Sequence, residues 1–269
     1  PIIQDYYHVE SEEAFFSILP TATQYSRNAI FSGLLPSEME KMFPNFWLND
    51  EEEGGKNLHE EAFLQAQLKR LNKDIKVSYN KITNFNAGKK LSDNLSNLFQ
   101  NKLNVIVYNF VDMLSHSRTE SEMIRELADD EPAYRSLTLS WFEHSPLLEM
   151  VKFIASKKCK LIITTDHGTV HVKEPTKVIG DKSVNTNLRY KQGRALDYNA
   201  KEVFEIKNPA DAFLPKQNVS SRFIFAREDK FFAYPNNFNH YVQYYKNTFQ
   251  HGGVSLEEMI IPYITLSAK

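Results

Sequence analysis

Apolar, strand-like residues lead directly into polar ones in the stretch Lys160-Leu-Ile-Ile-Thr-Thr-Asp-His-Gly-Thr-Val-His-Val172. Residues 161–163 form a short apolar, β-branched run of the kind that is buried on both faces of a sheet. In an open α/β sheet, ligands bind at the carboxyl ends of the strands, so Asp166 and His167 can both reach one ion there. Gly168 lets the backbone turn after them. The stretch therefore predicts an α/β fold with a metal site at the end of this strand.

Two further stretches place acid or imidazole beside an apolar run. Asn104-Val-Ile-Val-Tyr-Asn-Phe-Val-Asp-Met-Leu-Ser-His116 ends in an Asp and a His four residues apart, and His251-Gly-Gly-Val-Ser-Leu-Glu-Glu258 precedes the apolar run 259–265. Nitrogen and carboxylate donors suit Zn²⁺ or Mn²⁺ and are poor for Ca²⁺ or an iron–sulfur cluster. The candidate metal ligands are Asp112, His116, Asp166, His167 and His251.

The composition is that of a globular chain that needs no cross-links. With 269 residues, 42% of them hydrophobic, it can fill one large core, and its single cysteine, Cys159, excludes an internal disulfide. A net charge of -2 and a pI near 6.5 argue against binding nucleic acid through bulk charge. No apolar run approaches the ~20 residues of a membrane span and no signal peptide opens the chain, which predicts a cytoplasmic protein without membrane insertion. The first residue, Pro1, indicates a piece of a longer polypeptide.

A length of 269 residues is enough for one large α/β domain or two small ones, and we predict a single domain over 1–269. Strands are predicted at 14–20, 76–79, 160–163 and 259–265, and helices at 21–33, 60–72, 89–102, 134–156 and 237–249. Strand, helix, strand order of this kind builds a mostly parallel sheet flanked by helices. The pattern changes at about 172–234, which predicts an antiparallel insertion in which 222–226 pairs with 231–234.

A threonine-rich elbow precedes the first predicted helix. The chain passes from a strand into Thr21-Ala-Thr-Gln-Tyr-Ser-Arg-Asn-Ala-Ile-Phe-Ser-Gly33, which aims hydroxyls and backbone N–H groups at a helix N-terminus. This arrangement is typical of an anion site that contains a nucleophile. The alternative interpretation is ordinary helix capping by threonine or serine.

A basic loop, Asn185-Thr-Asn-Leu-Arg-Tyr-Lys-Gln-Gly-Arg194, supplies candidate substrate contacts. Arg189, Lys191 and Arg194 can hold a phosphate, and Tyr190 can stack on a base. The alternative is a solvated loop that binds nothing.

The ordered set of motifs resembles a known superfamily. A Pro-Thr-x-Thr elbow at 20–23, Asp-x-x-x-His at 112–116, Asp-His-Gly at 166–168 and His-Gly-Gly at 251–253 follow the order found in the alkaline phosphatase superfamily of two-metal phospho- and sulfohydrolases. Within it, segments 20–33 and 249–258 are most similar to the PglZ branch, and there to the effector domains of two-component response regulators of the type IX secretion system. The likeness covers nearly the whole chain.

The resemblance implies a role for each site residue. Thr23 takes the position of the nucleophile that bridges two metal ions, because it stands ten residues before Gly33 as the family's threonine stands before its Thr/Ser-Gly. Zinc is the expected metal and manganese the alternative. One ion is held by Asp112, His116 and His251, and the other by Asp166, His167 and Thr23. The substrate contacts implied beside the nucleophile are Ser26, Arg27 and Asn28, with Ser26 where related diesterases carry Asn.

Family members have one more Asp, at the end of the first sheet strand and upstream of the nucleophile. Asp5, in Ile3-Gln-Asp-Tyr-Tyr7, does not end a buried strand. We therefore expect the first strand and its Asp to lie outside this chain.

The activity implied by the resemblance is two-step hydrolysis of nucleotide or oligonucleotide phosphodiesters. An upstream receiver domain, a sensor histidine kinase and a sigma factor are implied as well. The alternative is a signalling or interaction module that keeps the fold and metals as structure and acts by forming a homodimer or docking to a partner. A phosphomutase or sulfatase of the same superfamily is a third interpretation.

Overall fold

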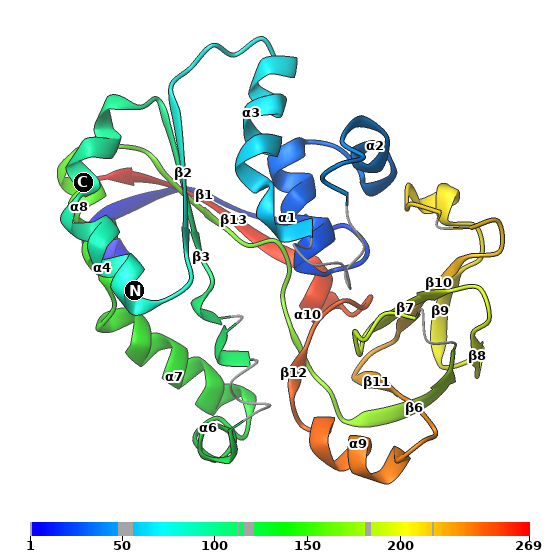
Figure 1. Cartoon of the computed structure of the whole chain (residues 1–269). Coiled ribbons are helices and arrows are strands. Elements are labelled where there is room, and N and C mark those ends of the chain that lie inside the picture. Colours follow the sequence, from blue (N-terminus) through cyan, green and yellow to red (C-terminus); the bar gives the residue numbers. More distant parts are fainter. Residues whose placement is uncertain (1, 48–55, 112, 116–120, 181–183, 217) are drawn as a thin grey trace. The chain divides into compact units, whose positions relative to one another are not determined.

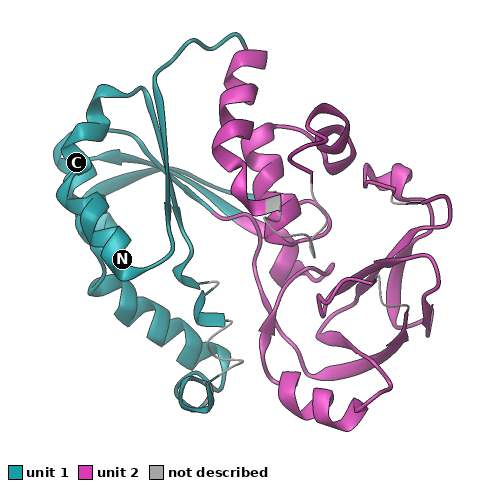
Figure 2. Cartoon of the chain, in the orientation of Figure 1, with its two compact units in different colours: residues 1–14, 72–164, 262–269 teal, residues 15–71, 165–261 magenta. Residues whose placement is uncertain are grey.

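The computed structural model (Figure 1) describes residues 2–47, 56–111, 113–115, 121–180, 184–216 and 218–269. The chain divides into two compact units (Figure 2): unit 1 comprises 1–14, 72–164 and 262–269, and unit 2 comprises 15–71 and 165–261. Each unit is assembled from segments that are far apart in the sequence. The single domain over 1–269 and the insertion at about 172–234 remain predictions.

Unit 1 combines a sheet that contains β4 with a parallel strand pair. Strand β13 (Ile260–Ala268) lies between β1 (Tyr7–Phe16) and β4 (Leu161–Thr164), and β2 (Val77–Ile82) pairs in parallel with β3 (Leu103–Tyr108). The helical segments of this unit include η1 (Ile2–Asp5), α4 (Phe85–Asp93), η3 (Leu95–Gln100), α6 (Glu122–Leu127), α7 (Glu131–Glu143) and α8 (Pro146–Ser156).

Helix α8 forms the core of unit 1 with residues from both groups of strands. Val151 packs with Tyr7 and Leu266, and its carbonyl accepts a hydrogen bond of 2.8 Å from the Tyr7 hydroxyl. Met150, the residue before Val151 in the same helix, packs against Ile82 of β2. Leu161 and Ile163 of β4 pack against the cluster around Val151, so the amphipathic helix supports the strand that leads into the Asp-His-Gly loop.

Three features of unit 1 differ from the predictions. The helix predicted over 134–156 is two helices, because Pro146 has no N–H to donate and begins a new helix in its first turn. Strand β4 is not buried on both faces, since Ile162 is 49% exposed. A mostly parallel sheet is not confirmed either: β4 pairs antiparallel with β13, with Ile163 opposite Ile264. The missing N-terminal strand remains a prediction.

Unit 2 combines helices near the elbow with short strands. Its described helical segments are α1 (Thr23–Ser32), α2 (Pro36–Met42), η2 (Lys56–Leu58), α3 (Glu60–Arg70), η4 (Pro209–Ala212), α9 (Phe238–Tyr245) and α10 (Leu256–Met259). Its described strands are β5 (Val170–His171), β6 (Glu174–Ile179), β7 (Tyr190–Gly193), β8 (Asp197–Tyr198), β9 (Val203–Ile206), β10 (Arg222–Ala226), β11 (Lys230–Ala233) and β12 (Phe249–Gln250). The helices described in both units include none long and apolar enough to cross a membrane.

The strand pairing in unit 2 corrects one prediction. Strands β10 and β11 do not form a hairpin, because β10 pairs antiparallel with β7 and β9 while β11 pairs in parallel with β6. Both faces of β10 are buried: Ile224 packs with Phe232 of β11, and Phe223 and Phe225 point to the opposite side. Strands β10 and β11 therefore pack against each other through side chains and are not paired by backbone hydrogen bonds in one sheet.

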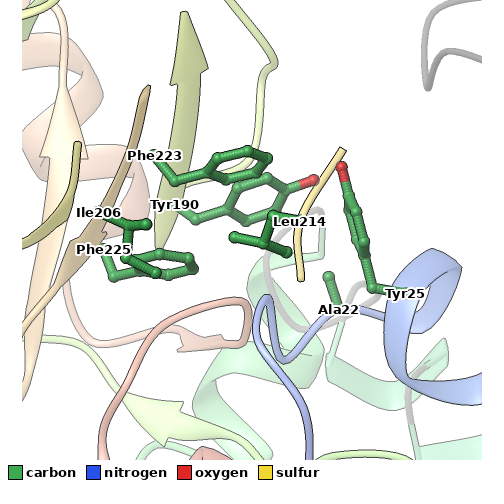
Figure 3. Packing of buried hydrophobic residues seen from close by; sticks show 7 residues of the cluster. All are labelled: Ala22, Tyr25, Tyr190, Ile206, Leu214, Phe223 and Phe225. Carbon is green, nitrogen blue, oxygen red and sulfur yellow. The ribbon is translucent and has the colours of Figure 1, made fainter. Parts of the chain in front are cut away.

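An aromatic cluster holds the start of α1 against the β7-β10-β9 sheet (Figure 3). Tyr25 of α1 makes an edge contact with Tyr190, with ring centroids 5.9 Å apart and planes at 89°. The other members of the cluster are Ala22, Ile206, Leu214, Phe223 and Phe225. Tyr190 is fully buried, so its predicted role as a platform for a base is wrong. The cluster instead fixes the elbow from which Thr23 projects.

Candidate active site

Four of the predicted site residues converge in unit 2. Thr23 Oγ1 lies 3.1 Å from His167 Nε2, and Asp166 Oδ2 lies 3.7 Å from the same nitrogen. The imidazole of His251 stacks on that of His167, with ring centroids 4.0 Å apart and an interplanar angle of 13°. The elbow, the Asp-His-Gly loop and the His-Gly-Gly loop thus supply side chains to one place.

Asp112 and His116, the other predicted ligands, lie outside the described residues. Within the part of the chain that the structure describes, no group of three His, Cys, Asp or Glu side chains is arranged to hold a metal ion. The four converging residues are thus one portion of the predicted two-metal site, and the remainder stays a prediction.

The hydroxyl of Thr23 is not used for helix capping. Helix α1 begins at Thr23, its N-cap is Ala22 in an extended conformation, and no described side chain caps it. Ser26 Oγ donates to the carbonyl of Ala22 at 3.0 Å. The capping interpretation of Thr23 is therefore wrong, because its buried hydroxyl faces the imidazole of His167 instead.

Backbone carbonyls fix the tautomers of both histidines. His167 Nδ1 lies 2.9 Å from the carbonyl oxygen of Gly168, and His251 Nδ1 lies 3.1 Å from that of Thr21. A carbonyl oxygen can only accept, so each Nδ1 carries the hydrogen and each neutral ring keeps a lone pair on Nε2. This arrangement is typical of metal-binding histidines, whose second nitrogen donates to an acceptor.

Asp166 has a carboxylate oxygen with no hydrogen-bond partner among the described residues. Its Oδ2 is buried and accepts no hydrogen bond from a described residue, while its backbone carbonyl accepts one of 2.6 Å from Ser17 Oγ. A buried carboxylate oxygen without a partner is costly unless a cation or donor completes it.

The donor atoms fit a divalent cation. Two ligands at about 2.0–2.1 Å from a tetrahedral zinc ion lie ~3.3 Å from each other. The distances from His167 Nε2 to Thr23 Oγ1, 3.1 Å, and to Asp166 Oδ2, 3.7 Å, bracket that separation. A carboxylate, an imidazole and a hydroxyl form a set that suits zinc or manganese.

The substrate contact predicted for Arg189 is corrected to a structural ion pair. Its side chain is fully buried, with Nε 3.0 Å from Glu258 Oε1 and Nη2 2.8 Å from Glu258 Oε2. Its remaining hydrogen bonds go to the carbonyl oxygens of Glu228 and Lys230. A guanidinium engaged in this way is not available to a phosphate.

Lys191 is also buried rather than set in a solvated loop. Its Nζ donates to the carbonyl of Asn185 at 2.8 Å and lies 4.8 Å from the centre of the Tyr234 ring. Arg194, the third cation of the predicted basic loop, is exposed, and its role as a substrate contact remains a prediction. The loop therefore supplies one surface cation, because Arg189, just before strand β7 (Tyr190–Gly193), and Lys191 within it are both buried.

The burial of Lys191 predicts a specific pH dependence of stability. Desolvation lowers the pKa of Lys191 to about 7. The unfolded chain keeps this proton up to pH ~10.4, so between about pH 7 and pH 10 it binds more protons than the folded chain and stability rises with pH. Below pH 7, burial of the protonated Lys191 lowers the free energy of unfolding by at most ~4–5 kcal/mol, at about 1.36 kcal/mol per pKa unit.

Replacing Lys191 by methionine is expected to raise the free energy of unfolding at pH 7 and to flatten its rise toward pH 9. Urea unfolding at several pH values measures both effects. Lys201→Met, at an exposed position of the same unit, is the control and should leave the rise unchanged. An unaltered rise in the Lys191→Met variant would show that Lys191 does not cause it.

The three residues predicted beside the nucleophile have different surroundings. Ser26 and Asn28 are buried, and Asn28 Nδ2 donates to the carbonyl of Gln24 at 2.9 Å, which corrects Asn28 to an interior residue of α1. Arg27 pairs with Glu60 of α3 at 2.9 Å, so its guanidinium links two helices. Ser26 keeps a position from which it can contact a ligand, because it borders a cavity.

Removal of Arg27 is expected to destabilise the protein. In Arg27→Met the carboxylate of Glu60, whose side chain is 2% exposed, loses its cationic partner, and breaking a buried pair in this way costs about 3 kcal/mol. Arg135→Met is the matched control: the Arg135–Glu131 pair is 76% and 56% exposed, so its loss is worth at most ~0.5 kcal/mol. Equal losses in urea unfolding would refute the interior role of Arg27.

A cavity of ≈ 310 Å³ adjoins the converging residues. Its polar lining consists of Ser17, Ser26, Glu38 and Asp166. Apolar side chains form most of the remaining wall: Phe16, Ile18, Ala29, Ile30, Leu34, Leu35 and Ile261. Of the four converging residues, Asp166 lines this cavity, which connects the cavity to the candidate site.

Sequence reasoning missed the residues that support the site. Ser255-x-x-Glu258 is a capping-box pattern that marks the start of α10, and the structure has this box. Nothing local indicates that Glu258 also pairs with Arg189, 69 positions earlier, or that Thr21 binds the His-Gly-Gly loop.

Comparison with known families identifies the chain as an alkaline phosphatase-like domain. A family model described as "BREX system PglZ alkaline phosphatase-like domain" matches residues 2–266. The chain belongs to this PglZ family, which confirms the family predicted from the motifs.

Solved structures with the same fold include a phosphonoacetate hydrolase from Sinorhizobium meliloti 1021. Its complex with phosphonoformate has 12% sequence identity and a TM-score of 0.57, over 98% of this chain and 82% of that chain. Its complex with phosphonoacetate gives 12% identity and a TM-score of 0.56 over the same shares. At this identity the similarity shows the fold alone. No curated protein matches the chain.

Proposed function

We propose that this domain is a metal-dependent phosphodiesterase that uses Thr23 as its nucleophile. The observation that carries the proposal is the contact between the Thr23 hydroxyl and His167 Nε2, 3.1 Å apart and beside the unsatisfied oxygen of Asp166. Zinc is the proposed metal and manganese the alternative. Asp166, His167 and Thr23 would hold one ion, and His251 would hold the other with Asp112 and His116.

Thr23 and the groups that hold the two imidazoles would have separate roles in this reaction. Bound divalent cations would make the Thr23 hydroxyl more acidic and stabilise charge on the attacking and leaving oxygens. Thr23 Oγ gives its proton to solvent and forms a bond to phosphorus, while the bond from phosphorus to the leaving oxygen breaks and that oxygen takes a proton from solvent. Water then cleaves the phosphothreonine, which releases a phosphomonoester and restores Thr23. The carbonyls of Gly168 and Thr21 hold the two imidazoles in their tautomers throughout.

Charge near the nucleophile favours a diester over a monoester. A monoester brings two negative charges, and the cation nearest to Thr23 in sequence, Arg27, is paired with Glu60. A diester brings one charge and a second ester arm, for which the adjacent cavity of ≈ 310 Å³ has room. The proposed substrates are nucleotide or oligonucleotide phosphodiesters, with Arg194 as a contact to a flanking phosphate.

The wider biological role rests on the sequence resemblance. We propose a cytoplasmic effector domain of a two-component response regulator similar to PorX of the type IX secretion system, with a sensor histidine kinase and a sigma factor as partners. The competing proposal is a signalling or interaction module that keeps the metal site as structure and works through a homodimer or a docked partner.

Substrate preference tests the proposed activity. After chelation and addition of zinc or manganese, a chromogenic phosphodiester and a dinucleotide are expected to turn over at least about tenfold faster than the matching monoester, ~1.4 kcal/mol in barrier. Phosphonoacetate, bound by the S. meliloti enzyme, belongs in the same panel. Faster monoester turnover would indicate a phosphatase, and absence of turnover with metal bound would favour the interaction module.

A further inference from the structure

Glu258 is a fully buried acid that lies between the two loops carrying the histidines. Its carboxylate accepts hydrogen bonds from the backbone N–H of Gly253 at 2.8 Å and of Ser255 at 3.1 Å, and from the Ser255 hydroxyl at 2.6 Å. The first of these bonds reaches the His-Gly-Gly loop two residues after His251. The side chain therefore fixes the backbone that carries one imidazole.

The main chain of the same residue fixes the other loop. The carbonyl oxygen of Glu258 accepts a hydrogen bond of 2.9 Å from the N–H of Gly168, the residue that follows His167. One amino acid thus bonds to both loops, and the imidazoles that those loops carry lie 4.0 Å apart.

Glycine is required in both loops for this approach. A Cβ atom at Gly168 would lie 2.0 Å from the carbonyl oxygen of Glu257. A Cβ atom at Gly253 would lie 2.8 Å from Arg189 Nη2 and 2.9 Å from Glu258 Oε2. Contacts of this length with backbone and buried side chains exclude a side chain, so the second glycine of His-Gly-Gly and the glycine of Asp-His-Gly serve the same junction.

Arg189 supplies the charge that makes a buried carboxylate tolerable. Its two hydrogen bonds to Glu258, of 3.0 and 2.8 Å, form a bidentate pair whose side chains are both 0% exposed. Bidentate pairing fixes direction as well as charge. Thr21 of the threonine-rich elbow also holds the His-Gly-Gly loop. Its Oγ1 donates to the carbonyl of Gly253 at 2.8 Å and accepts from the N–H of Gly252 at 3.1 Å.

We infer that Glu258 is a positioning residue that sets the separation of His167 and His251, with Arg189 holding its carboxylate in place. The described partners of its carboxylate are Arg189, Gly253 and Ser255, so it would act through the loops and not on the substrate. The consequence for metal binding and turnover rests on the proposed function, whereas the consequence for the two imidazoles does not.

Paired substitutions separate the acceptor role of Glu258 from its charge. Changing Glu258 alone would leave the buried charge of Arg189 without its carboxylate counter-ion, so both double variants contain Arg189→Met. Glu258→Gln keeps an oxygen that accepts from Gly253, and Glu258→Met of similar volume does not. Zinc affinity, measured by competition with a chromophoric chelator, is expected to fall 10–100-fold further in the methionine pair than in the glutamine pair. Glu257→Gln, at an exposed neighbour on the same helix, should match the parent.

Imidazole nitrogen NMR of the metal-free proteins gives a second readout. The signals of His251 and His167 are expected to stay near their parent positions in the glutamine pair and to shift or broaden in the methionine pair. Identical signals and equal zinc affinity in the two double variants would overturn the inference. If the parent protein binds no zinc, the proposed function fails, and the histidine signals still decide the role of Glu258.

Amide exchange in the unmodified protein needs no variant to fold. The N–H groups of Gly168 and Gly253 both donate to Glu258, so they are expected to be protected and to exchange together. Exchange of either amide at the rate of an exposed loop would contradict the inference directly.

Discussion

Thr23→Ala is expected to retain the fold and the metal, which keeps its carboxylate and imidazole ligands, but to lose hydrolysis by at least about 10³-fold, ~4 kcal/mol in barrier. The substitution removes only the hydroxyl that faces His167 Nε2 at 3.1 Å. Helix α1 should form as before, because its N-cap is Ala22 and Thr23 provides no side-chain cap. Initial rates on a chromogenic phosphodiester, with metal content determined on the same samples, measure the effect.

Thr23→Ser is the matched control for this result. It keeps the hydroxyl and removes only a methyl group, so it should recover most of the rate that Thr23→Ala loses. Unchanged turnover in the alanine variant would show that Thr23 is a packing residue. Equal loss in both variants would indicate that the methyl contact, and not the hydroxyl, matters.

Asp166→Asn is expected to abolish stabilisation by metal without destabilising the metal-free protein. The Oδ2 atom of Asp166 is buried and has no hydrogen-bond partner among the described residues, so removing its charge costs the metal-free fold nothing. In the parent protein, zinc at 100 times its Kd should add about 2.7 kcal/mol to the free energy of unfolding. The variant should lose most of this gain, because a first ligand supplies the binding energy.

Thermal unfolding with and without zinc measures both parts of this prediction. Asp197→Asn, at an exposed carboxylate of the same unit, should behave as the parent. A zinc-dependent rise of the same size in Asp166→Asn would exclude Asp166 as a ligand. A marked loss of stability without metal would show instead that its carboxylate has a structural partner.

Hydrophobic spacing and helix-end residues, which are signals within one stretch of sequence, correctly predicted two helical features. The leucine spacing in 60–72 predicted a helix, and α3 (Glu60–Arg70) is that helix. The predicted end of the first helix is confirmed as well, since Gly33 caps α1 in the left-handed conformation with φ 61. The Asp-His-Gly, His-Gly-Gly and threonine motifs led to residues that the structure brings together.

Burial of charge was not predictable from a single stretch. Arg189 and Lys191 lie in a segment rich in polar residues and have the composition of a solvated loop. Their burial depends on partners that are distant in sequence: Glu258 for the guanidinium and Tyr234 for the ammonium group. The predicted pairing of 222–226 with 231–234 was wrong for the same reason. Strand β10 pairs with β7 and β9, which a single stretch of sequence does not reveal.

The most direct test of the account is to trap the covalent intermediate. The metal-loaded protein is mixed with a phosphodiester, quenched in acid during the first turnover, digested and mapped by mass spectrometry. The account predicts one phosphoryl group, esterified to the substrate's remaining arm, on the peptide that contains Thr23, and its absence after chelation. Turnover with no adduct, or an adduct on another residue, would contradict the assignment of Thr23 as the nucleophile.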